Sequence, residues 1–166
     1  MTLSSHTRRA VVSAAVHARK GDMQGITSLG HVAIRVKDID RSLDFYVNKM
    51  GFEEMFRLDK DGALWIVYLR VTDDQYVELF PGGEGDRSPA TEAVGYNHVC
   101  FTVDDIDAVI ARLEARGVQL SRPKKVAVDR NAQAWVEDPD GNRVELMQML
   151  PGCLHFEAIE RLKARR

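Results

Sequence analysis

The sequence predicts an α+β fold in which two repeated βαβββ modules form a curved mixed sheet. The first observation is a repeated phrase, because HVAIRVKDID at residues 31–40 returns as HVCFTVDDID at residues 98–107. The second is that the same shift in register carries YVELF at residues 76–80 onto RVELM at residues 143–147. A segment that matches at its beginning and at its end in one register indicates a repeated structural unit.

A third observation is that both copies follow the same order of patterns. Each begins with an alternation of apolar and polar residues, continues with helical spacing, and ends with strands separated by turn signals. These patterns divide the chain into a basic tail at residues 1–25, a domain at residues 26–150 and a C-terminal helical extension at residues 151–166. Within the domain, module one spans residues 29–82, a linker spans residues 83–95, and module two spans residues 96–149.

The opening strand of each module has two different faces, because successive side chains of a strand point to opposite sides of the sheet. One face is apolar, with Val32, Ile34 and Val36 in module one and Val99, Phe101 and Val103 in module two. The other face carries His31, Ala33 and Arg35, or His98, Cys100 and Thr102. We expect the apolar faces to pack under helices and the histidine faces to lie on the opposite side.

A helix is predicted after each opening strand. In module one Asp40 is the expected N-cap and Gly51 ends the helix, and in module two Asp105 and Gly117 have these positions. The strands that follow are expected at residues 53–58, 63–71 and 75–80 in module one and at residues 118–122, 132–137 and 143–149 in module two. Turn signals such as Asp61-Gly62 separate them.

Composition excludes several classes of function. The chain has 166 residues, of which 45% are apolar and 29% charged, which is typical of a globular protein with a core. A net charge of −2 without basic runs argues against a nucleic-acid partner, and no apolar stretch reaches the length of a membrane span. Two cysteines are too few for a disulfide framework and favour a reducing, cytoplasmic location.

Four residues at equivalent positions of the two modules form the candidate site. Glu78 and Glu145 lie in YVELF and RVELM, where strand parity places them on the same side of the sheet as His31 and His98. Two imidazoles and two carboxylates suit one divalent metal ion, and four protein ligands leave open positions for a substrate. If a two-fold axis relates the modules, this face closes into a metal-binding cleft.

These motifs resemble the vicinal oxygen chelate superfamily and, within it, glyoxalase I (lactoylglutathione lyase). The matching text is HVAIRVKDIDRSLDFY, YVELF, NHVCFTVDDID and WVEDPDGNRVELM, which together span residues 29–149. The resemblance implies paired βαβββ modules around a metal cleft that is often shared between the subunits of a homodimer. It implies one divalent metal ion per site, Ni, Co or Zn with Fe or Mn as alternatives, held by His31, Glu78, His98 and Glu145.

The reaction that the resemblance implies converts the hemithioacetal of methylglyoxal and a thiol, glutathione or another, into a thioester through a metal-bound enediolate. Glu145 matches the family's usual catalytic base, and Glu78 is the second catalytic carboxylate. Arg35 matches a substrate-binding arginine that contacts a carboxylate of glutathione. Gly82 and Val94 stand where the family usually has asparagine and arginine, so the identity of the thiol stays open.

Two other functions are compatible with the same residues. An extradiol dioxygenase resembles this pattern too, but it would hold iron with His31, His98 and Glu145 and leave Glu78 without a role. A non-catalytic protein that binds a small molecule in the same cleft needs none of the four ligands. The presence of all four therefore favours a lyase that acts on a small molecule.

Overall fold

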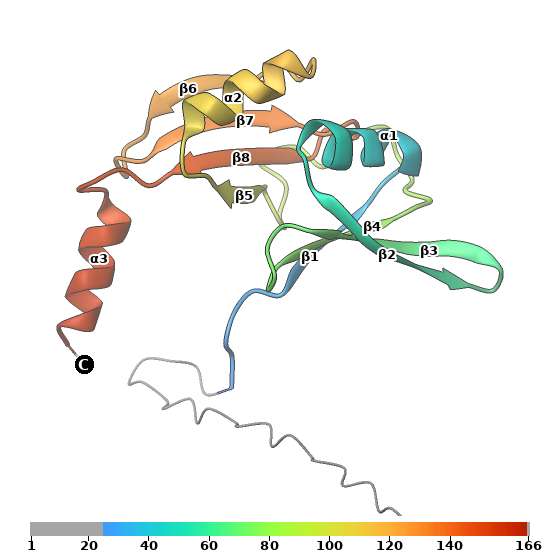
Figure 1. The fold of residues 1–166 in the computed structure, drawn as a ribbon, viewed down its shortest axis with the longest axis horizontal. Helices are drawn as coiled ribbons and strands as arrows, with labels where there is room; N and C mark the ends of the chain where they lie inside the picture. The colour runs from blue at the N-terminus through green and yellow to red at the C-terminus, as the bar shows by residue number, and fades with distance from the viewer. Residues whose placement is uncertain (1–24, 166) are drawn as a thin grey trace, which may run out of the picture.

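The computed structural model of the protein describes residues 25–165 and contains two four-stranded sheets, each with its helix on one side (Figure 1). The predicted basic tail, residues 1–25, lies outside the described residues except for Gly25. The α+β fold of two βαβββ modules is confirmed, and each module forms a sheet of its own. The two sheets have the same strand order, so the repeat in the sequence is also a repeat in the structure.

Module one consists of β1 (His31–Arg35), α1 (Ile39–Leu43), the π-helical segment η1 (Asp44–Lys49), β2 (Glu53–Lys60), β3 (Ala63–Arg70) and β4 (Tyr76–Phe80). Its sheet has the order β1-β4-β3-β2, in which β1 and β4 are parallel and the other neighbours antiparallel. The widened turns of η1 place the adjacent side chains of Phe45 and Tyr46 together in the core, where the two are 4% and 0% exposed.

The N-cap of the first helix is Asp38, so the prediction of Asp40 is wrong. The Asp38 carboxylate accepts hydrogen bonds from the backbone amides of Asp40 (3.0 Å) and Arg41 (3.1 Å). A cap stands immediately before the first helical residue, and the chain already has helical geometry at Ile39. Asp40 therefore lies inside the first turn, where its negative charge favours the helix N-terminus.

Module two consists of β5 (Val99–Thr102), α2 (Ile106–Ala115), β6 (Arg122–Val126), β7 (Ala132–Glu137) and β8 (Arg143–Gln148), in the sheet order β5-β8-β7-β6. Asp105 caps α2 as predicted and accepts from the amide of Ala108 at 3.0 Å. The strand predicted at residues 118–122 begins only at Arg122. Val118 instead packs in the core, and Pro123 has no amide hydrogen to continue a regular ladder.

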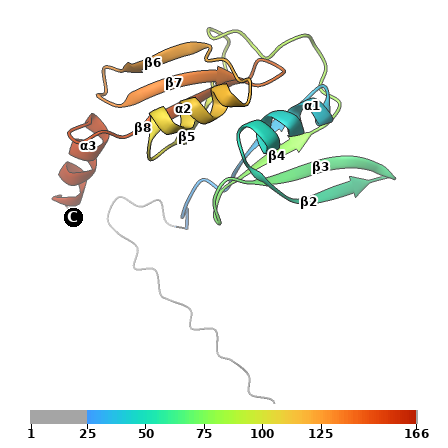
Figure 2. The same ribbon diagram turned by 45° about the horizontal axis from the view of Figure 1, so that its top comes forward.

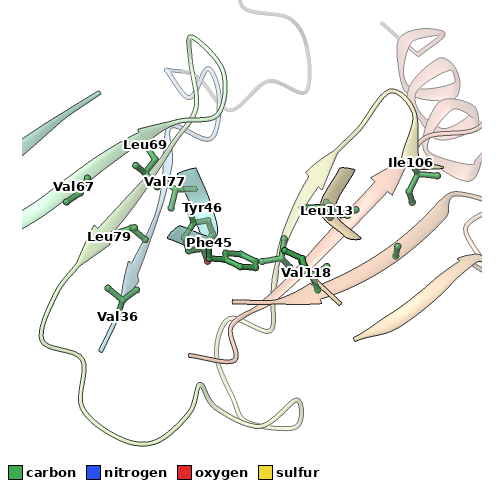
Figure 3. Packing of buried hydrophobic residues seen from close by; sticks show 14 of the residues in the cluster. Val36, Phe45, Tyr46, Val67, Leu69, Val77, Leu79, Ile106, Leu113 and Val118 are labelled. Atoms are coloured by element: carbon green, nitrogen blue, oxygen red, sulfur yellow. The ribbon is translucent and has the colours of Figure 1, made fainter. Parts of the chain in front are cut away.

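The core is continuous from one module to the other. Figure 3 shows Phe45 and Tyr46 of module one on one side of the cluster and Leu113 and Val118 of module two on the other, all in one set of buried side chains. The rings of Phe52 and Phe101 meet edge to face, with centroids 5.1 Å apart. The helical sides of both sheets therefore share one apolar interior, and no helix is packed against the opposite side of either sheet in the described chain.

The turn at residues 138–142 joins the modules by hydrogen bonds. The Tyr46 hydroxyl donates to Asp138 Oδ2 at 3.0 Å, and both residues are buried. Asp138 also accepts from the backbone amides of Asp140 and Asn142 and from the Asn142 side chain. Burial raises the pKa of Asp138 and, with the neighbouring Asp138 charge, that of Tyr46. This buried bond fixes η1 to the β7–β8 turn of module two.

The C-terminal helix α3 (Leu154–Lys163) lies within the predicted helical extension and leaves the end of sheet two (Figure 2). Its first turn contacts the β6–β7 turn, where the Leu154 amide donates to the Asp129 carbonyl at 3.0 Å. In the described part of the chain, every helix is too short or too polar to cross a membrane.

Candidate metal centre

Module one places His31 and Glu78 on the side of its sheet that carries no helix, here called its open face. In the parallel pairing of β1 with β4, Ala33 is opposite Glu78 and His31 lies two residues earlier on the same side. His31 Nδ1 is 3.5 Å from Glu78 Oε1, and the two side chains are 52% and 7% exposed. Tyr68, opposite Glu78 on β3, bonds to this carboxylate, and that hydrogen bond raises the pKa of the tyrosine.

Module two repeats this arrangement more tightly on its own open face. His98 Nε2 is 3.0 Å from Glu145 Oε2, and the two side chains are 31% and 8% exposed. His98 Nδ1 is 3.0 Å from Asn97 Oδ1, and the Trp135 ring meets the imidazole edge to face with centroids 4.7 Å apart. A neutral His98 that donates from Nδ1 to Asn97 keeps the lone pair of Nε2 free for a ligand bond.

The chemistry of these groups fits a divalent metal ion. Glu145 Oε1 is buried and accepts no hydrogen bond from the described residues. A buried carboxylate oxygen without a donor is costly unless a cation meets it, and imidazole nitrogen with carboxylate oxygen is a common ligand set for divalent metals. Each open face therefore carries half of a suitable site.

The structure brings the four predicted ligands together as two pairs and does not bring the pairs together. Within residues 25–165 of one chain, no three His, Cys, Asp or Glu side chains come close enough to hold a metal ion. In Figure 1 the strands that carry the two pairs belong to separate sheets that do not close on each other. Within one chain, each pair is thus left with an open coordination sphere.

Arg35 lies on the open face of module one, as strand parity predicts. Its guanidinium donates to the Pro81 carbonyl at 3.1 Å and lies 5.6 Å from the centroid of the Phe80 ring. No carboxylate in the described chain forms an ion pair with it, so its remaining donors are available to an anion. Arg35 also lines a cavity of about 160 Å³ between the end of β1 and the linker, together with Lys37, Gly83, Arg87 and Asn142.

Several residues of the open faces are not predicted by the sequence pattern. Tyr68 reaches Glu78 only because β3 pairs with β4 in this register, which alternation within one strand does not reveal. Arg122 stacks on Trp135 at 5.2 Å from the ring centroid, and the late start of β6 puts it there. Cys100 shares the face of His98, and partial burial together with the Glu145 carboxylate raises the pKa of its thiol to about 12.

A cavity of about 410 Å³ lies away from these pairs, beneath α2. It is lined by residues from both modules, among them Met50, Phe101, Val109, Leu113 and Leu146. None of the four predicted ligands borders it. The side chains that are predicted to bind a metal ion therefore lie on the two open faces and not in this cavity.

Comparison with known proteins agrees with this geometry. The model of the Glyoxalase/Bleomycin resistance protein/Dioxygenase superfamily matches residues 28–146. The lactoylglutathione lyase of Pseudomonas aeruginosa is 32% identical over 145 residues, which cover 71% of this chain and 80% of the relative. The structure of the glyoxalase family protein from Enterococcus faecalis has a TM-score of 0.64 at 28% identity and covers 72% of this chain and 96% of that one. The lactoylglutathione lyase structure from Agrobacterium tumefaciens has a TM-score of 0.57 at 25% identity, with 75% and 96% covered.

Proposed function

The chain belongs to the Glyoxalase/Bleomycin resistance protein/Dioxygenase superfamily, and from this premise we propose that it is a metal-dependent lyase of the glyoxalase I type. It isomerises the hemithioacetal of methylglyoxal and a thiol, glutathione or another, to a thioester. The observation that carries the proposal is the pairing of one histidine with one buried glutamate on each open face, at 3.5 and 3.0 Å. Relatives named lactoylglutathione lyase at about 30% identity support it.

In this proposal the working unit is a homodimer in which each site takes one half from each subunit. His31 and Glu78 come from one subunit, and His98 and Glu145 from the other. The separation of the two pairs within one chain supports this arrangement, because four ligands require both open faces to meet. These four residues would hold one Ni, Co or Zn ion, with Fe or Mn as alternatives, and when bound it would polarise the substrate oxygens and stabilise the negative charge that develops on proton loss.

Glu145 is the proposed base. It removes the proton from the carbon that carries sulfur and hydroxyl and returns a proton to the neighbouring carbonyl carbon. The hydroxyl hydrogen moves to the second oxygen, so that the composition of the molecule is unchanged. Glu145 suits this role because its Oε2 lies 3.0 Å from His98 Nε2, whereas its Oε1 is buried and has no donor among the described residues. Glu78 is the second carboxylate, and its bond to Tyr68 leaves it less free to accept a proton.

Arg35 is the proposed substrate-binding residue, for a carboxylate of the thiol. Gly82 and Val94 offer no polar side chain, and both residues lie exposed between β4 and β5. The thiol is thus recognised by fewer polar groups than the family pattern supplies. Cys100 and Cys153 are both free thiols, in keeping with the cytoplasmic location that we propose.

An extradiol dioxygenase is the weaker alternative. That chemistry needs an iron ion held by two histidines and one carboxylate, with the remaining positions open. Glu78 is paired with His31 on one open face just as Glu145 is paired with His98 on the other. A second carboxylate in the equivalent place supports a four-ligand site.

Mixing two impaired variants tests the shared site, with the activity of each variant alone subtracted. A dimer of one Glu78→Gln chain and one Glu145→Gln chain has both changes in one site and neither change in the other. Random exchange of subunits therefore restores about a quarter of the wild-type thioester-forming rate. The protein is loaded with Ni, Co or Zn and assayed with methylglyoxal and several thiols.

The controls separate the two parts of the proposal. Wild-type protein taken through the same exchange measures the recovery of activity. An inactive mixture beside an active wild type contradicts the shared site. No thioester from wild-type protein with any metal and thiol contradicts the lyase itself.

A further inference from the structure

Helix α3 has an apolar surface that no other part of the described chain covers. The helix spans Leu154–Lys163, and none of these residues is buried. Phe156, Ile159 and Leu162 are spaced so that they share one broad side of the helix. We define the α3 patch as these three side chains with the neighbouring Val128, whose exposed fractions are 44% for Phe156, 41% for Ile159, 53% for Leu162 and 98% for Val128.

The direction of α3 is fixed although its apolar side chains are not packed. Asn131, which is fully buried, has its side-chain nitrogen 2.8 Å from His155 Nδ1. Arg130 makes two hydrogen bonds of 2.8 and 3.0 Å to the Glu157 carboxylate. These contacts hold the first turn to the β6–β7 turn, whereas the rest of the helix has no such support. A helix of ten residues is marginal alone in water, so a surface that covers its apolar side would stabilise it further.

The α3 patch stands beside the open face of module two. Figure 1 shows α2 on one side of this sheet and α3 on the other, at the end of β8. The anchor of the helix is close to the candidate metal centre. Cys100 is opposite Glu145 in the pairing of β5 with β8, and the charge of Asp129, whose carbonyl holds the Leu154 amide, is near enough to raise the pKa of the Cys100 thiol. Any molecule that covers this open face therefore also lies next to α3.

A second copy of the chain has a matching surface. Six of its exposed large apolar side chains belong to module one and the segment before it, namely Ile26, Leu29, Met55, Phe56, Leu58 and Trp65. In Figures 1 and 2 the β2–β3 ribbon and α3 lie at opposite ends of the molecule, so this ribbon does not cover the α3 patch of its own chain. A two-fold axis lets each of two chains cover the patch of the other with the same contact.

We infer that the α3 patch docks on module one of a second copy of this chain and closes the end of the shared site. This inference rests on the proposed shared site and adds a contact that lies outside its four ligands. The occupant is a second copy because the proposed site already brings module one of that copy onto the adjoining open face. Exposed apolar area of this extent on an anchored helix is typical of an interaction surface.

The test changes two side chains of the patch and measures the dimer. The variant is Ile159→Gln with Leu162→Gln. The matched control is Arg161→Gln with Arg165→Gln, of which Arg161 lies on the other side of α3 and Arg165 lies just beyond its C-terminal end. Sedimentation over a range of concentrations gives the dimer dissociation constant. We expect the patch variant to raise this constant at least about 100-fold, since both copies lose two apolar contacts, and the control to stay within about threefold.

Amide hydrogen exchange gives a second measurement that needs no substitution. Docking slows the exchange of the α3 amides as wild-type protein passes from monomer to dimer, whereas cover by a segment of the same chain is independent of concentration. The docking is wrong if the patch substitutions leave the dimer dissociation constant unchanged, or if the α3 amides exchange at the same rate in monomer and dimer. Neither result contradicts the shared site. A wild-type chain that stays monomeric at every concentration overturns both.

Discussion

The two modules carry the same histidine and glutamate in different surroundings. In module one His31 is half exposed, lies 3.5 Å from Glu78, and faces a carboxylate that Tyr68 also contacts. In module two His98 is oriented by Asn97 and lies 3.0 Å from Glu145, one of whose oxygens has no donor among the described residues. The repeat thus preserves the donor atoms while the neighbours of each pair differ.

The difference indicates a division of labour between the halves. Module two holds its pair more firmly and keeps a carboxylate oxygen free for a proton. Module one has the more exposed histidine, and it carries Arg35 at the position where module two has Thr102. We therefore expect changes in module two to act mainly on the chemical step and changes in module one mainly on substrate binding.

The largest effect is expected from the two glutamates. Glu145→Gln lowers kcat by about 10²–10⁴-fold, which is the range for loss of a general base. Glu78→Gln lowers kcat less, because its carboxylate already accepts a hydrogen bond from Tyr68. The rate of thioester formation at saturating substrate measures both, with the metal content of each variant determined alongside. Equal kcat values for the two metal-loaded variants contradict the division of labour.

A smaller effect is expected when module one is made to resemble module two at its substrate-binding position. Arg35→Thr raises KM for an anionic thiol adduct by roughly 10–100-fold, since a charge-assisted hydrogen bond is lost, and leaves kcat within about threefold. The matched control is Arg57→Thr, which removes an arginine of the same module that is already paired with Glu54. A KM that does not respond to Arg35 contradicts the assignment.

The smallest effect concerns the contact between the modules. Tyr46→Phe removes one hydrogen bond to the buried Asp138 carboxylate and lowers the free energy of unfolding by about 1–2 kcal/mol. For a chain of this size the melting temperature falls by roughly 2–8 °C, which calorimetry measures. Tyr76→Phe is the control, because its hydroxyl bonds a backbone carbonyl in an exposed turn. Equal losses from the two variants contradict a special role for the buried bond.

The repeat allows much of the fold to be predicted. Comparing its two copies also corrects the N-cap of the first helix, which the sequence of module one alone does not. The shift that aligns His31 with His98 also aligns Asp38 with Asp105, so the cap observed in module two already indicates the correct cap in module one. Alternation along each strand correctly places His31 and Glu78 on one face. It gives no information on Tyr68, which depends on pairing between strands.

Other features depend on tertiary packing and could not be predicted from one sequence. The π-helical geometry of η1 accompanies the burial of two adjacent aromatic residues, Phe45 and Tyr46. The late start of β6 follows from the burial of Val118. The pairs His31–Glu78 and His98–Glu145 come from local parity. Their meeting in the proposed dimer depends on contacts between subunits, which alternation along one chain does not indicate.

The buried turn at residues 138–142 has a practical consequence for modified forms of this protein. Because Tyr46, Lys37 and Ser88 all bond to it from outside module two, an insertion there disturbs the alignment of both halves. The Asp61-Gly62 turn of the β2–β3 hairpin is exposed and adopts the left-handed backbone typical of a tight turn. Exposed loop tips of this kind tolerate added residues, so a fluorescent label or affinity tag belongs at the hairpin.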